Sequence, residues 1–117
     1  MKTTPKQFEL FKKECAHYIE KFHLNGFEFR FFHTDNPDIK AQIQTHQLSA
    51  GVISIYLGKD WKNTEKITDA NIKAVAKHEM VHALIAEYAN IATSRYVTEP
   101  EEYLANEKLT NKLEKLL

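Results

Sequence analysis

Two histidines and a glutamate in the second half of the chain have the types and spacing of a metal-dependent hydrolytic site. They form the sequence His78-Glu79-Met80-Val81-His82. On a helix, residues four apart lie about 40° apart around the axis and roughly 6 Å apart along it, so both imidazoles can reach one ion. Glu79 points to the side, where its carboxylate can take a proton from a metal-activated water. Two imidazoles, one carboxylate and an open position favour zinc, one ion per chain.

The residues around this pattern argue against a chance match. In a chain with six histidines, such a pattern arises by chance about three times in a hundred. Lys73, Lys77 and Glu87 share the opposite side of the predicted helix, so the histidines are expected to face the core. A single histidine there is readily explained by packing, but two beside an acid would be costly to bury without a ligand. The apolar residues that surround the histidines are Ile72, Val75, Ala83, Ile85, Ala86 and Ala89.

A third ligand is expected from a last helix, which opens at Thr98 and continues to Leu117. Three glutamates on it are candidates. Glu101 is better explained as the acid of a capping box with Thr98. An apolar stripe on this helix places Glu102 at its centre and Glu107 off its edge, so periodicity alone favours Glu102. The stripe consists of Ala105, Leu109, Leu113 and Leu116.

The remaining elements form a scaffold for these helices. Thr4, Pro5 and Gln7 predict a capped helix start, and the amphipathic pattern that follows ends near Asn25-Gly26. Strands are predicted over 27–33, 39–48 and 50–58, and the active-site helix over 69–90. The expected fold is α+β: a single domain over 1–117 in which helices cover one face of a three-stranded, mainly antiparallel sheet. Strand 50–58 is either the edge that binds an extended peptide or an ordinary interior strand.

Composition and charge exclude several other classes of protein. Lys and Arg together number 16, as do Asp and Glu, so the net charge is zero and gives no basis for binding nucleic acid. Cys15 is the only cysteine, which favours a reducing compartment and a buried core thiol rather than an extra metal ligand. We found neither a membrane span nor a secretory signal, so a cytoplasmic protein is expected, as a monomer or weak homo-oligomer.

The pattern His78–His82 followed by Asn106-Glu107-Lys108-Leu109-Thr110-Asn111 resembles the gluzincin metallopeptidases. In that family, His-Glu-x-x-His is followed on a second helix by Asn-Glu-x-x-Ser-Asp. The resemblance implies that Glu107 is the third zinc ligand, with Glu102 as the alternative. It also implies that Asn111 supports a metal-binding histidine on the side of the ring away from the metal. The family has an acid at this position. Size and element order are closest to the minigluzincins and related phage or prophage metallopeptidase-like proteins.

Two functions from different classes follow. The first is a zinc metallopeptidase that hydrolyses a peptide or protein substrate, with Glu79 as general base. The second is a catalytically weak or inactive zinc-binding protein that acts as a protein-interaction module. Retention of Glu79 favours the first, because a structural zinc site has no need of that acid. Absence of the C-terminal subdomain that supplies an oxyanion donor in thermolysin-like enzymes favours the second, although four side chains are candidates for that donor: His46, Arg95, Tyr96 and Tyr103.

Overall fold

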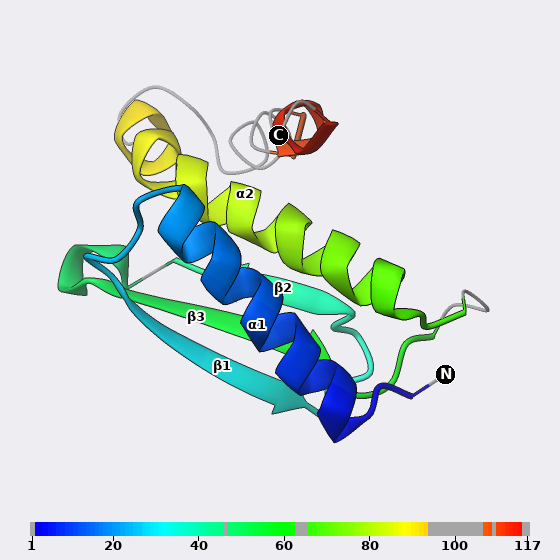
Figure 1. Ribbon diagram of the computed structural model, residues 1–117. Coiled ribbons are helices and arrows are strands. Elements are labelled where there is room, and N and C mark those ends of the chain that lie inside the picture. Colours follow the sequence, from blue (N-terminus) through cyan, green and yellow to red (C-terminus); the bar gives the residue numbers. More distant parts are fainter. Residues whose placement is uncertain (1, 46, 63–65, 94–106, 109, 116–117) are drawn as a thin grey trace.

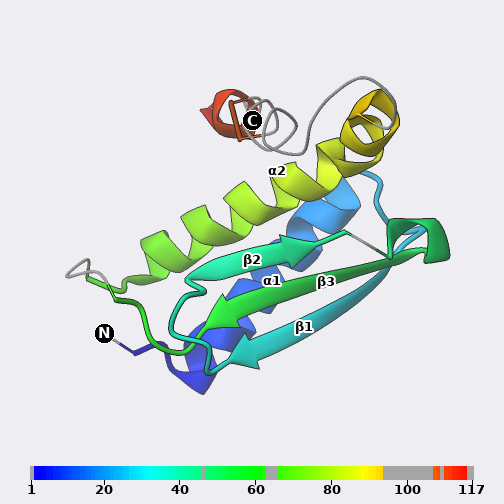
Figure 2. The same ribbon diagram turned by 180° about the vertical axis from the view of Figure 1, so that it is seen from behind.

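Two long helices lie against one face of a three-stranded sheet, as the computed structural model shows (Figure 1). The structure describes residues 2–45, 47–62, 66–93, 107–108 and 110–115. Seen from behind, the sheet lies in front of both helices and its other face is uncovered by them (Figure 2). The expected α+β fold is confirmed. No helix in the described ranges is long and apolar enough to cross a membrane.

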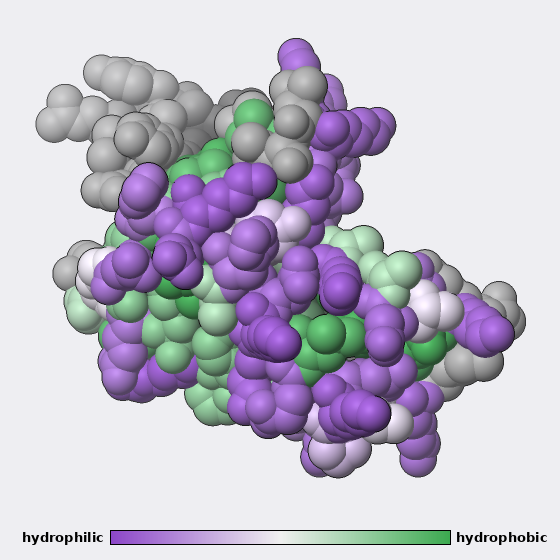
Figure 3. Space-filling model, in the orientation of Figure 1, coloured by the Kyte–Doolittle hydropathy of each residue, from purple (hydrophilic) through white to green (hydrophobic). Residues whose placement is uncertain are grey.

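Helix α1 (Pro5–Lys21) begins as predicted and ends earlier than predicted. Thr4 caps it: its side chain accepts from the backbone N–H of Gln7, and the Gln7 side chain accepts from the Thr4 N–H. At the other end, His23 adopts the left-handed conformation with φ 56°. The backbone N–H of Leu24 then closes on the carbonyl of Ile19, so the helix ends before Asn25-Gly26. The outward face of this side of the molecule is largely hydrophilic, as an amphipathic helix requires (Figure 3).

The sheet is mixed rather than mainly antiparallel, which corrects the expected strand pairing. Its order is β1 (Glu28–Thr34), β3 (Val52–Gly58), β2 (Ala41–Gln44). β3 pairs parallel with β1 and antiparallel with β2. Pairing of neighbours in the chain would place β2 in the centre. Instead the most apolar strand, β3, lies there, because a central strand is the best covered by its neighbours.

Strand β3 is therefore the interior strand, and β2 forms the edge nearest α2 (Figure 2). The alternating residues Ile53, Ile55 and Leu57 are fully buried toward the helices. The predicted strands at 39–48 and 50–58 are both shortened, because a 3-10 turn, η1 (Leu48–Ala50), and Gly51 with φ 76° lie between them. The free edge beside the second helix thus belongs to β2.

Helix α2 (Asp69–Thr93) packs along α1 and provides the second layer of the core. Thr68 accepts a hydrogen bond from the backbone N–H of Asn71, which begins the helix where the sequence predicts. Its inner side chains contact α1 and the sheet. The fully buried members of this contact are Ile72, Ala76 and Met80 from α2, Phe11 and Cys15 from α1, and Trp61 from the preceding linker.

Candidate metal centre

The side chains of His78 and His82 leave α2 on the side that faces the C-terminal helical segment, residues 107–108 and 110–115. This segment, red in Figure 1, runs beside α2. The His78 and His82 side chains are 27% and 14% exposed. The expectation that both face the core is therefore corrected: they are half-buried between two helices and do not belong to the core cluster. The reason is that the neighbouring residues Met80 and Val81 already occupy the buried arc of the helix.

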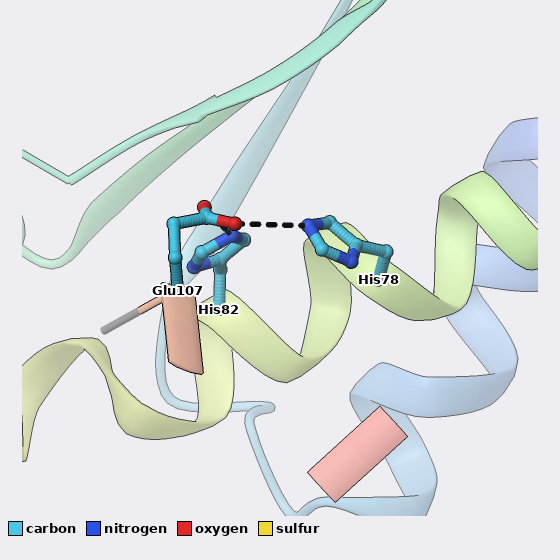
Figure 4. Close-up of side chains that lie close together, drawn as sticks. All are labelled: His78, His82 and Glu107. Carbon is cyan, nitrogen blue, oxygen red and sulfur yellow. Dashed lines mark ion pairs between the residues drawn. The ribbon is translucent and has the colours of Figure 1, made fainter. Parts of the chain in front are cut away.

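Glu107 brings a carboxylate to the imidazoles from the C-terminal helical segment (Figure 4). Its Oε1 lies 2.8 Å from Nε2 of His82, and its Oε2 lies 3.9 Å from Nε2 of His78. One donor atom from each of the three residues lies within 4.8 Å of the others. The residue that the gluzincin pattern implies as third ligand is thus placed in the cluster. Glu101 and Glu102 lie outside the described residues.

The spacing of these donors suits a small divalent cation. Four-coordinate zinc binds nitrogen and oxygen at about 2.0–2.2 Å, so tetrahedral donors lie roughly 3.4 Å apart. The two measured separations, 2.8 and 3.9 Å, fall on either side of that value. Two imidazole nitrogens and one carboxylate also leave a fourth position open, which is the composition of a catalytic rather than a structural site.

The other ring nitrogens are held by the same C-terminal helical segment. Nδ1 of His82 lies 3.1 Å from Oγ1 of Thr110, which is fully buried. Nδ1 of His78 is hydrogen-bonded to the carboxylate of Glu114. Asn111, which the resemblance implied for this supporting role, is exposed. Both Nε2 atoms therefore face Glu107, and both Nδ1 atoms contact side chains of the C-terminal helical segment, Thr110 and Glu114.

Glu114 is a site residue that the sequence analysis did not identify. A usable signal exists: residues 107, 110 and 114 are spaced i, i+3 and i+7, which places all three on one face of a helix. The apolar stripe of that helix does not include position 114, and the gluzincin pattern ends at Asn111. Polar residues with the same helical spacing beyond the pattern would have indicated Glu114.

Glu79 is the buried acid of the site, with 7% of its surface exposed. Its pKa is raised from 4.5 to about 7, mainly by burial; His78 lowers the pKa, and the carboxylates of Glu107 and Glu114 raise it. A cation bound nearby would favour the ionised form, by the same attraction that any positive charge exerts on a carboxylate. Glu79 is thus an acid whose proton is released or taken up near neutral pH, which suits a general base.

A cavity of about 370 Å³ opens beside Glu79, between α2 and the edge strand. It is lined by Lys40 and Ala41 next to β2, by side chains between positions 71 and 79 of α2, and by Glu114. Its volume falls in the range of small-molecule and peptide side-chain pockets. The cavity therefore connects the candidate metal centre to a free strand edge.

Cys15, the remaining candidate among the described residues, does not join this centre. Cys15 is fully buried in the core cluster, and burial, with a smaller effect of Glu79, raises the pKa of its thiol. This is the environment of an inert core thiol. The four candidate oxyanion donors, His46, Arg95, Tyr96 and Tyr103, lie outside the described residues. No protein family model, curated protein or solved structure matches the chain.

Proposed function

We propose that the chain is a zinc-dependent peptidase in which His78, His82 and Glu107 hold the ion and Glu79 is the general base. The observation that carries the proposal is the combination of these four side chains. Two Nε2 atoms and one carboxylate converge from two helices, and a buried acid stands next to them on the wall of a cavity. A site that only stabilised the fold would gain nothing from burying Glu79, because burial of an ionisable group is unfavourable.

Zinc at this centre would acidify a water molecule and polarise the carbonyl of the scissile bond. Glu79 would take the proton of the attacking water and pass it to the leaving amine. It follows His78 directly on α2, so its carboxylate shares the cavity with the His78 ring without belonging to the ligand group. The C-terminal helical segment keeps the two ring nitrogens oriented through Thr110 and Glu114. These roles make His78 and His82 binding residues and Glu79 the catalytic residue.

The substrate would be an extended peptide that lies along β2. Among the described strands this one pairs with β3 alone, and Ala41 at its start lines the cavity, so its other edge is the candidate place for an added strand. An added peptide strand would gain main-chain hydrogen bonds there and place a side chain between Ala41 and Val75. The scissile bond would then lie over Glu79 and the metal centre. Within this proposal β2 takes the role that one interpretation of the sequence gave to strand 50–58.

The test compares Glu79→Gln with wild-type protein, each with one equivalent of zinc. Cleavage of a peptide library is followed by mass spectrometry. We expect new termini with wild-type protein and a loss of rate of about 10²- to 10⁴-fold in Glu79→Gln, because a positioned general base contributes that much. Glu20→Gln, which makes the same chemical change at an exposed site on α1, should cleave as wild type does. If wild-type protein binds zinc but releases no new termini, the protein is a zinc-binding interaction module instead.

A further inference from the structure

The C-terminal helical segment contributes one polar side chain more than the proposed peptidase centre requires. Glu107 is a ligand candidate and Thr110 meets His82. Glu114 lies one helical turn further on and meets His78. It belongs to no motif identified in the sequence. Its carboxylate also lines the cavity that Glu79 borders, so it touches both the ligand group and the substrate space.

The contact fixes which nitrogen of His78 is available to a metal. A neutral imidazole carries its proton on one nitrogen and a lone pair on the other. When Nδ1–H donates to the Glu114 carboxylate, the lone pair is on Nε2, the atom that faces Glu107. The same hydrogen bond restricts rotation of the ring, so Nε2 stays directed at the metal centre. A carboxylate acceptor also strengthens the imidazole as an electron donor.

A purely stabilising ion pair is a poorer account of this contact. The side chains of His78 and Glu114 are 27% and 32% exposed, so the pair is partly open to water, which weakens the attraction between two charges. Glu114 is also not a ligand in this arrangement, since it meets Nδ1 and not the side of the ring where the Nε2 atoms converge. The two histidines differ accordingly: a carboxylate supports His78, and the neutral hydroxyl of Thr110 supports His82.

We propose that Glu114 is the positioning residue of the metal centre, which sets the tautomer and orientation of His78. This inference rests on the proposed zinc site. It assigns the supporting role to a residue seven positions after the ligand Glu107, on the same helical face, in place of the exposed Asn111. The expected consequence is that loss of the Glu114 carboxylate weakens zinc binding although every metal ligand remains.

The test measures zinc affinity by competition with a chromophoric chelator in four proteins: wild type, Glu114→Ala, Glu114→Gln and the control Lys112→Ala. Lys112 is exposed on the same helical segment. Loss of a partner behind a metal-binding histidine commonly costs about 10- to 100-fold in affinity. We expect a loss of that size in Glu114→Ala, a smaller one in Glu114→Gln, whose amide oxygen can still accept from Nδ1–H, and none in Lys112→Ala. Circular dichroism of the metal-free proteins verifies folding, and Glu114→Gln preserves shape if Glu114→Ala does not fold.

A second readout separates positioning from mere stabilisation of the helix. Cobalt(II) substituted for zinc has a visible spectrum that depends on ligand orientation. We expect Glu114→Gln to change the position or intensity of these bands and Lys112→Ala to leave them as in wild type. Unchanged spectra together with zinc affinities within twofold of wild type would overturn the role of Glu114. If wild-type protein binds no zinc, the proposed metal site itself fails; if it binds zinc with the expected dependence on Glu114 but cleaves no peptide, only the peptidase proposal fails.

Discussion

Histidines of the described residues have two different kinds of surroundings, and the pair on α2 is best compared with His33 on β1. Nε2 of His33 lies 2.6 Å from Oγ1 of Thr3. The Thr3 hydroxyl donates to the carbonyl of Gly58 at 2.8 Å, so it accepts from the His33 ring. The ring stacks on Phe8 with centroids 4.7 Å apart, and burial lowers the pKa of His33. A neutral imidazole here joins the N-terminal segment, α1 and the sheet.

The α2 histidines have acidic surroundings instead. Carboxylates of Glu107 and Glu114 contact their rings, and the pKa of Glu79 is raised to about 7, mainly by burial with a contribution from those carboxylates. A packing site gains nothing from three acids so close together, because like charges repel and burial disfavours each. A bound cation would attract the three carboxylates and so favour their ionised forms. The contrast supports a packing role for His33 and the proposed metal binding by the α2 pair, on the basis of their partners rather than of their burial.

The strongest way to test this contrast is to remove each ring in turn. His78→Ala and His82→Ala should each lose zinc binding almost completely, whereas His33→Ala should bind one zinc per chain. His33→Ala should instead lose stability by roughly 1–3 kcal/mol, since it leaves Thr3 without its ring partner and opens a cavity beside Phe8. Metal content after dialysis, measured by plasma mass spectrometry, and urea unfolding give the two quantities. Folded His33→Ala without zinc, or His78→Ala with a full equivalent, would contradict the distinction.

Because it is buried, the Glu79 side chain should lower the stability of the metal-free protein. The pKa of Glu79 is 4.5 when unperturbed and about 7 in the fold. Between these pH values the folded state binds more protons than the unfolded state, so stability falls as pH rises from 4.5 toward 7. Metal-free Glu79→Gln, which cannot ionise, should therefore be more stable than wild type at pH 8, by up to roughly 3 kcal/mol.

Urea unfolding of both metal-free proteins at pH 4.5, 6 and 8 measures this difference, which should shrink toward the lowest pH. Glu20→Gln, exposed on α1, should show no comparable change with pH. One equivalent of zinc should reduce the advantage of Glu79→Gln, because a cation favours the ionised carboxylate of wild type. An equal stability of both metal-free proteins at every pH would show that Glu79 carries no such cost.

The smallest effects are expected from the two threonines that meet histidine rings. Thr110→Val should weaken zinc binding by about 10-fold, because His82 loses its partner at Nδ1. Thr3→Val should leave zinc affinity unchanged and lower stability by about 1–2 kcal/mol, since His33 and Gly58 lose their shared hydroxyl. The same two measurements, zinc competition and urea unfolding, serve both variants. An equal loss of zinc affinity in both would remove the difference between the two histidine environments.

Local features of this fold were predictable from the sequence, and features set by long-range packing were not. The Thr4 capping box depends on four consecutive residues, and the structure has it. The end of α1 was missed because His23 adopts a conformation more typical of glycine. The sequence left open whether strand 50–58 lies at an edge or inside the sheet, and the expected antiparallel pairing was wrong for β1 and β3, because the pairing of strands far apart in the chain depends on long-range packing.

In the candidate site, too, some residues were predictable from local sequence and others depend on long-range packing. The spacing of His78 and His82 follows from one helix, so the sequence alone indicates that both rings can reach one ion. The choice between Glu102 and Glu107 depends on how a second helix meets α2; periodicity favoured the former, and the family pattern implied the latter, which the structure places at the cluster. The helical spacing of residues 107, 110 and 114 indicates that Glu114 shares a face with Glu107, but its contact with His78 depends on the same meeting of two helices.

The most direct measurement for the central claim is anomalous X-ray diffraction from crystals grown with zinc, recorded on both sides of the zinc absorption edge. We expect one strong zinc peak per chain, bonded to Nε2 of His78, Nε2 of His82 and the carboxylate of Glu107. A protein that shows no zinc peak at this position, or whose zinc is held by other side chains, would contradict this claim.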